Sequence, residues 1–364
     1  MRVGVNAAVI SGQMTGVGYH ALSLVRALAR VGKDIEWILM GADPSSNSIP
    51  KGENIRTIGA ERPLGGARRA AWQQWALPRL AVRAGVELLY CPDYSRPVWS
   101  AAPVVNTIHD LSFYSCSPPF LPFGSRLWKG SLARLAIARS ARLIADSDFI
   151  RDEILQRFRI DPLRVAVIPL AAEELPEQPR EKAAHPFLLF VGTLETRKNL
   201  VTLIKAFAAL RASGRVSHRL VLVGKAGYGW HEISAAIDAS PFRQEIEVRG
   251  YEKRQEVLRL YRSADLFVFP SLYEGFGLPL LEAMACGAPV ACSRVASLPE
   301  VAGDAAEFFD PARAEDLAAA MERVLRSPEL QESLRRKGKE RVKQFSWDEC
   351  ARRHCQVFRD LVRE

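Results

Sequence analysis

The feature of this sequence that most constrains its fold is a regular alternation of short apolar runs with longer amphipathic stretches. The apolar runs have the length and composition of buried strands, and the stretches between them have the spacing of helices. The expected strands of the first half are 2–6, 36–40, 86–90, 104–108, 142–145 and 165–168. Those of the second half are 187–191, 220–223, 246–248, 266–269 and 288–292. Because strands that alternate with helices form parallel sheets through right-handed crossovers, the chain is predicted to be α/β with two doubly wound, Rossmann-like parallel sheets.

A polar stretch with two prolines, residues 171–185, separates the two halves and is typical of a linker. The 364 residues exceed what one ordinary core accommodates. We therefore expect an N-terminal domain over residues 1–170 and a second domain over residues 186–345, facing each other across a cleft at the carboxyl ends of their strands. Residues 346–364 indicate one last amphipathic helix, which we expect to cross back to the N-terminal domain.

The composition is that of a globular protein, with 48% hydrophobic and 25% charged residues. No apolar run approaches the roughly 18 residues that a membrane-spanning helix needs. Six cysteines stand at irregular spacings without a C-x-x-C pair, which favours thiols in a reducing compartment over disulfides or zinc. The first residues read directly as a strand and not as a secretory signal. We therefore expect a cytoplasmic protein.

The formal net charge of +9 is concentrated between residues 60 and 142, which hold eleven Lys/Arg against four Asp/Glu. Such a block could attract an anionic membrane surface, a polyphosphate-linked substrate or nucleic acid. No nucleic-acid recognition motif accompanies it, so we expect no nucleic-acid partner. Within the block, residues 125–139 predict a helix with leucines on one side and cations on the other. It is either a core-facing helix with a solvated basic face or a weak peripheral contact with an anionic membrane at the inner face.

The most informative motif follows the expected strand 266–269 and runs Ser-Leu-Tyr-Glu-Gly-Phe-Gly-Leu-Pro-Leu-Leu-Glu-Ala-Met-Ala-Cys-Gly-Ala-Pro-Val. Glu274 lies in its glycine-bearing loop, which opens onto a helix with proline at the first position. The backbone amides of Phe276, Gly277 and Leu278, at the positive end of the helix dipole, would suit a diphosphate. Glu282 is expected in the first turn of that helix, where the dipole favours a carboxylate in any case.

A second motif, Phe-Val-Gly-Thr-Leu-Glu-Thr-Arg-Lys-Asn-Leu, lies at the first strand-to-helix turn of the second half. Arg197 and Lys198 precede the helix expected over residues 200–212, so both could reach a diphosphate at a neighbouring turn. Cationic side chains can neutralise a nucleotide leaving group without a metal. The alternative is an ordinary basic helix start, which the helix dipole slightly disfavours.

Two further features of the first half could face the cleft. The segment from Gly16 to Ala21 matches the dinucleotide fingerprint G-x-G-x-x-A, but about nine residues separate it from the first strand, whereas the fingerprint needs a tight turn. His109 ends the strand 104–108 at its carboxyl end, where a functional histidine is more common than elsewhere. Asp110, the next residue, is expected to orient the loop.

Residues 146–148, Asp-Ser-Asp, have the D-x-D form that binds a metal–nucleotide complex in another glycosyltransferase fold. They lie between a strand and the start of a helix near Phe149, where serine and aspartate are good N-caps. We therefore interpret them as a helix cap and expect no metal.

Glu274 and Glu282, with seven residues between them, resemble the E-x7-E signature of retaining glycosyltransferases of the two-domain GT-B fold, in particular glycosyltransferase family 4. The resemblance implies retaining transfer of a sugar from a nucleotide diphosphate to an acceptor hydroxyl, with no cofactor beyond the donor substrate. It implies that Glu274 binds hydroxyls of the donor sugar and Glu282 the ribose. It assigns to Arg197 and Lys198 the charge of the departing diphosphate.

The same resemblance extends to the first half. It implies that the backbone at Gly16 approaches the donor phosphate and that His109 contacts the donor sugar. Family members often carry an arginine directly after the glycine of the second motif, where this chain has Thr193. That departure concerns the detail of the diphosphate contacts.

The forms Gly-Thr-Leu-Glu-x-Arg-Lys-Asn and Ile-His-Asp-Leu-Ser-Phe are similar to those of bacterial mannosyltransferases of polysaccharide assembly. This similarity favours GDP-mannose as donor and a glycan or lipid-linked saccharide as acceptor. Glu252 could accept hydrogen bonds from guanine, or it could be a solvated helix cap. A UDP-sugar-dependent retaining glycosyltransferase is the close alternative, and a nucleotide-sugar epimerase of the same fold or a catalytically silent binding subunit are the others.

Overall fold

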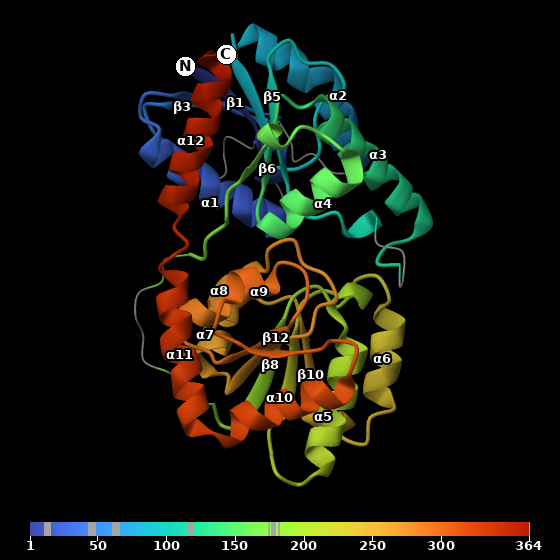
Figure 1. Ribbon diagram of the computed structural model, residues 1–364. Helices are drawn as coiled ribbons and strands as arrows, with labels where there is room; N and C mark the ends of the chain where they lie inside the picture. The colour runs from blue at the N-terminus through green and yellow to red at the C-terminus, as the bar shows by residue number, and fades with distance from the viewer. Residues whose placement is uncertain are drawn as a thin grey trace. The chain divides into compact units, whose positions relative to one another are not determined.

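The computed structural model describes residues 1–10, 16–42, 49–59, 66–114, 119–173, 175, 180 and 183–363. The chain divides into two compact units, coloured in Figure 1 by residue number. Unit 1 comprises Met1–Tyr114, Phe123–Leu170 and Ser346–Glu364. Unit 2 comprises Ser115–Pro122 and Ala171–Phe345. Each unit is built on its own parallel sheet, so the sequence prediction of an α/β protein with two doubly wound sheets is confirmed.

Unit 1 contains a seven-stranded sheet with the order β3-β2-β1-β4-β5-β6-β7. Its strands are β1 Arg2–Asn6, β2 Glu36–Met40, β3 Ile55–Ile58, β4 Leu88–Cys91, β5 Val104–Ile108, β6 Arg142–Ala145 and β7 Val165–Val167. Its α-helices are α1 Gly16–Val31, α2 Gly66–Arg83, α3 Phe123–Arg139, α4 Asp148–Phe158 and α12 Trp347–Arg363. None of the helices in the described part of the chain is long and apolar enough to cross a membrane.

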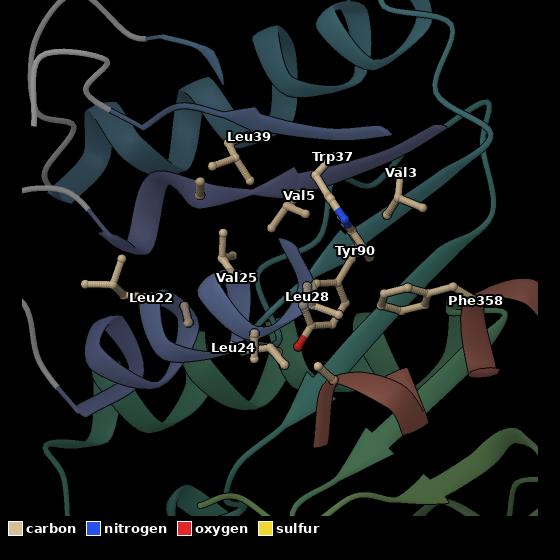
Figure 2. Close-up of a cluster of buried hydrophobic side chains, with 14 of the residues drawn as sticks. Val3, Val5, Leu22, Leu24, Val25, Leu28, Trp37, Leu39, Tyr90 and Phe358 are labelled. Carbon is tan, nitrogen blue, oxygen red and sulfur yellow. The ribbon is translucent and has the colours of Figure 1, made fainter. Parts of the chain in front are cut away.

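The last helix belongs to the core of unit 1. Val3 and Val5 of β1 point to the same face of the sheet, because side chains alternate along a strand. Together with Trp37 and Tyr90 they pack against α1 and α12, as Figure 2 shows. The ring of Phe358, from α12, lies 5.2 Å from that of Tyr90 between centroids. Residues separated by most of the chain therefore share one apolar core, and α1 and α12 lie side by side in Figure 1.

Unit 2 contains a six-stranded sheet with the order β10-β9-β8-β11-β12-β13. Its strands are β8 Phe187–Val191, β9 Arg219–Val223, β10 Ile246–Gly250, β11 Leu266–Phe269, β12 Val290–Ser293 and β13 Glu307–Phe309. Its α-helices are α5 Leu200–Ala212, α6 Trp230–Asp238, α7 Arg254–Ser263, α8 Leu278–Ala285, α9 Leu298–Ala302, α10 Ala314–Arg326 and α11 Pro328–Val342.

Two strands were missed by the sequence analysis, and both lie at a sheet edge. β3 has the sequence Ile-Arg-Thr-Ile, with no fully buried residue, and β13 has only three residues. An edge strand pairs on one side only and buries little, so it lacks the continuous apolar run by which central parallel strands are recognised. The central strands were all found, because both of their faces are covered by helices.

Candidate functional site

The order of strands in unit 2 reverses at β8. From β8 the chain continues to β9 and β10 on one side and later to β11, β12 and β13 on the other. Because β8 and β11 are parallel neighbours, the loops that follow them leave the sheet side by side at its carboxyl edge. Ligands of open α/β sheets bind at such a switch point. The motif with Arg197 and Lys198 follows β8, and the motif with Glu274 follows β11.

The two motifs are joined by ion pairs. Lys198 Nζ donates a hydrogen bond to Glu274 Oε1, and Arg197 Nη1 donates one to Glu274 Oε2 at 3.0 Å. Arg197 also donates to the carbonyl oxygen of Tyr273 at 2.8 Å and pairs with Glu195 at 2.9 Å. The cluster therefore holds two cations and two carboxylates, and Glu274 is at its centre.

This environment keeps Glu274 ionised. Burial by itself would raise the pKa of Glu274, but the charges of Lys198 and Arg197 outweigh it and lower the pKa to about 2. The pKa of Lys198 is lowered by burial and then by the neighbouring Arg197. Its ammonium group lies 5.0 Å from the ring centroid of Phe269, the last residue of β11. The site thus presents a buried carboxylate together with two cations that an anionic ligand could recruit.

The glycine loop after Glu274 has little freedom to accept other residues. Gly277 has φ 101°, in the left-handed region, and a Cβ atom there would lie 2.8 Å from Leu298 Cδ2. The hydroxyl of Ser297 donates to the carbonyl oxygens of Glu274 and Phe276 at 3.0 and 3.1 Å. The loop is therefore held in one shape up to Leu278, where α8 begins and where helix amides lack intrahelical partners.

The expectation that Glu282 lies in the first turn of its helix is wrong. The left-handed conformation of Gly277 lets α8 start at Leu278, with Pro279 as its second residue, so Glu282 is the fifth residue and belongs to the second turn. The dipole argument for this carboxylate therefore does not apply. A specific cation takes its place.

Glu282 is paired with residues that the sequence analysis did not find. Arg254 Nη1, at the start of α7, lies 2.8 Å from Glu282 Oε1, and the hydroxyl of Tyr261 donates to Oε2 at 3.3 Å. Arg254 also donates to Glu173 at 3.4 Å. Burial raises the pKa of Glu282, although Arg254 opposes the shift. An arginine at the start of a helix carries no signal of such a partner, because the pairing depends on how α7 and α8 pack.

In unit 1, His109 connects three loops at the carboxyl edge of the sheet. It follows β5, and its Nδ1 lies 2.5 Å from Asp146 Oδ2, after β6, while its Nε2 lies 2.8 Å from the carbonyl oxygen of Pro92, after β4. A carbonyl and a carboxylate both accept, so the ring donates from both nitrogens when it is charged. Burial would lower the pKa of His109, but Asp146 outweighs it, and the pKa rises to about 9.

The remaining sequence predictions for unit 1 fare differently. Ser147 Oγ accepts a hydrogen bond from the amide of Ile150 at 3.2 Å, so the interpretation of 146–148 as a helix cap is confirmed for Ser147. The first aspartate of the D-x-D form instead holds His109. Asp110 accepts from the amide and hydroxyl of Ser112 at 3.1 and 2.8 Å and so orients its own loop. Gly16 is the first residue of α1, and the rest of its glycine loop, residues 11–15, lies outside the described residues.

The two units and the charged cluster at the switch point define a class of protein, the glycosyltransferases with the GT-B fold. The structure is similar to sucrose-phosphate synthase from Thermosynechococcus elongatus, with a TM-score of 0.79 and 21% identity over 99% of both chains. It is also similar to Anabaena HepE in complex with UDP and glucose, with a TM-score of 0.71 and 16% identity over 98% of both chains. These similarities show the fold.

Sequence comparison identifies the family. Residues 14–172 match the family "Glycosyltransferase Family 4", and residues 171–341 match "Glycosyl transferases group 1". The O-antigen chain mannosyltransferase B of Escherichia coli is 31% identical over 96% of this chain and 97% of its own length. The chain therefore belongs to glycosyltransferase family 4, whose members retain the anomeric configuration of the sugar and use a nucleotide-sugar donor.

Proposed function

We propose that this enzyme transfers mannose from GDP-mannose to a hydroxyl group of a glycan or lipid-linked acceptor in bacterial polysaccharide assembly. The observation that carries the proposal is the ion-pair cluster of Glu274 with Lys198 and Arg197 at the switch point of unit 2. The similarity to an O-antigen chain mannosyltransferase along nearly the whole chain supports the choice of mannose. The excess of cations between residues 60 and 142 supports a cytoplasmic location at the inner face of the membrane.

The diphosphate of the donor is proposed to bind between the two cations and the start of α8. Lys198 and Arg197 are balanced by carboxylates in the ligand-free state, so they are held in place before the donor arrives. When a diphosphate binds, it competes with the carboxylates for these two cations. The amides of Phe276, Gly277 and Leu278, at the positive end of the helix dipole, add neutral donors to the same phosphates.

Glu274 is proposed to bind the donor sugar. Its pKa of about 2 keeps it a pure acceptor at neutral pH, which suits it to hydroxyl groups of the sugar. Glu282 is proposed to accept from the ribose hydroxyls, with Arg254 and Tyr261 holding it in position. His109 would contribute a fixed imidazolium near the sugar, since its ring nitrogens are already used within unit 1.

In the proposed reaction, the acceptor oxygen forms a bond to the anomeric carbon on the face from which the diphosphate leaves. The bond from that carbon to the phosphate oxygen breaks, and the acceptor proton passes to the departing phosphate oxygen. The chain's contribution is to stabilise the charge that develops on the diphosphate and to orient the sugar. This front-face route gives an α-linkage from an α-linked donor without a covalent sugar–enzyme intermediate.

The choice of base rests on Glu252, which follows the exposed Tyr251 at the end of β10 and could accept from the N1–H and amino group of guanine. A UDP-sugar donor is the second candidate, because HepE of the same fold binds UDP. A thermal-shift series with GDP, GDP-mannose, UDP and UDP-glucose separates the two. Stabilisation by GDP and GDP-mannose, followed by mannose transfer, supports the proposal. Stabilisation by UDP alone contradicts it, and turnover of the donor to an epimer without acceptor would indicate an epimerase.

A further inference from the structure

The helix α3 presents an outer face that the core of unit 1 does not use. Its inner face is buried through the small residues Gly130, Ala133 and Ala136 together with Ile137. On the outer face, the side chains of Phe123, Leu127 and Trp128 are exposed, with 72%, 57% and 58% of their surface open to solvent. Three large apolar side chains within six residues of one helix form a patch that usually marks an interaction surface.

The same face carries positive charge and no negative charge. Arg134 and Arg139 are exposed one to three turns further along α3. At about 100° per residue, these arginines and the apolar residues lie within roughly 160° of the helix circumference. The sequence from Leu111 to Ala145 contains five Lys/Arg and no Asp/Glu. The outer face of α3 is thus apolar in its first half and cationic in its second half.

This combination suits one kind of partner. A helix with apolar residues beside arginines, and with no acidic residue on its face, can lie in the interface of an anionic bilayer, where the apolar groups enter the headgroup–acyl boundary and the cations contact lipid phosphates. The face is convex, as the surface of a single helix must be, and so it offers no groove to a peptide. Leucine and phenylalanine would gain nothing from the phosphate backbone of a nucleic acid.

We propose that the outer face of α3 docks unit 1 on the surface of an anionic lipid bilayer, with Phe123, Leu127 and Trp128 inserted and Arg134 and Arg139 bound to lipid phosphates. The inference rests on the surface of unit 1 and is independent of which sugar the enzyme transfers. It would bring a lipid-linked acceptor within reach of the enzyme by confining both to one surface.

Co-sedimentation of the full chain with vesicles tests the proposal. We expect binding to vesicles of phosphatidylcholine with about 30 mol% phosphatidylglycerol, and at least tenfold weaker binding to phosphatidylcholine alone. Raising the salt from about 0.1 to 0.5 M should weaken the binding, because arginine–phosphate attraction is screened. Absence of binding to the anionic vesicles, or equal binding to both kinds, overturns the proposal.

Two variants locate the surface. The variant Phe123→Ser/Leu127→Ser/Trp128→Ser removes the apolar half, and Arg134→Glu/Arg139→Glu reverses the cationic half. Each should weaken vesicle binding at least tenfold while leaving the melting temperature unchanged, because the altered side chains are exposed. The control Arg336→Glu/Lys343→Glu makes the same charge change on exposed positions of α11, in unit 2, and should bind like the wild type. Equal loss in the control, or normal binding in both α3 variants, contradicts the assignment to α3.

Discussion

Lys198 donates a hydrogen bond to Glu274 across the loops that follow two neighbouring strands, β8 and β11, and both side chains are buried. The pairing joins residues 76 positions apart in the sequence. It keeps a carboxylate ionised and a lysine in place at the edge of the sheet where ligands of α/β proteins bind. The relation between these two residues connects donor binding, acid stability and turnover in this enzyme.

The first prediction concerns the charge of Glu274. Glu274→Gln keeps the size of the side chain and removes a negative charge next to the proposed sugar site. We expect turnover to fall about 100- to 1000-fold, as for other removed charge-orienting groups, while the affinity for GDP stays within a few-fold of wild type. Steady-state kinetics with a GDP titration measures both. Glu195→Gln, which also removes a partner of Arg197, should have the smaller effect, and near-normal turnover of Glu274→Gln would contradict the role of this residue.

The second prediction separates phosphate binding from base binding. Lys198→Ala should weaken the affinity for GDP roughly 10- to 100-fold, because a charge-assisted hydrogen bond to phosphate is lost. The affinity for guanosine, which has no phosphate, should be unchanged. Calorimetric titration with both ligands measures the difference. Lys205→Ala, at an exposed position of the following helix, is the matched control, and an equal loss of guanosine binding would point to misfolding and not to a diphosphate contact.

The third prediction is the dependence of stability on acid. The pKa of Glu274 falls from the model value of 4.5 to about 2 on folding. Its contribution to stability is therefore present above pH 4.5 and is lost as the pH falls towards 2, on the order of 3 kcal/mol in all. The melting temperature of the wild type should drop over this range, and that of Glu274→Gln should drop less steeply. Parallel curves for the two proteins would show that the pairing does not stabilise the fold.

The fourth prediction concerns His109 and Asp146. The pKa of His109 rises from 6.5 to about 9, so its pairing stabilises unit 1 fully below pH 6.5 and this stabilisation is lost as the pH rises through 9. Nuclear magnetic resonance should find the His109 ring doubly protonated at pH 7.5. In Asp146→Asn the ring should titrate at or below 6.5, because burial then acts without the opposing charge. A neutral His109 ring in the wild type at pH 7.5 would contradict the imidazolium.

The fifth prediction concerns the helix that completes the core of unit 1. Phe358 is fully buried between Tyr90 and Trp37. Phe358→Ala should lower the free energy of unfolding by about 3 to 5 kcal/mol through the lost burial and the cavity left behind. Arg352→Ala, on the exposed side of the same helix, should change it by less than about 0.5 kcal/mol. Denaturant unfolding measures both, and similar values for the two variants would mean that α12 contributes little to the core.

The sequence by itself determined the kind of fold and the positions of the site residues along the chain. Apolar runs that alternate with amphipathic stretches allow few arrangements other than parallel sheets covered by helices, and the central strands were found because they are buried on both faces. Glu274 and Arg197 could be placed after strands from local signals alone, since prolines, glycines and the ends of apolar runs mark where strands stop.

Only the tertiary structure decided which charges meet. The pairs Lys198–Glu274, Arg254–Glu282 and Asp146–His109 join loops or helices that are distant in the sequence. Strand order brings such loops to one edge of a sheet, and neither strand order nor helix packing is written in local patterns. The same cause explains the error at Glu282. Its charge is balanced by a cation on a neighbouring helix, whereas helix periodicity and dipole are the only partners that a local pattern can supply.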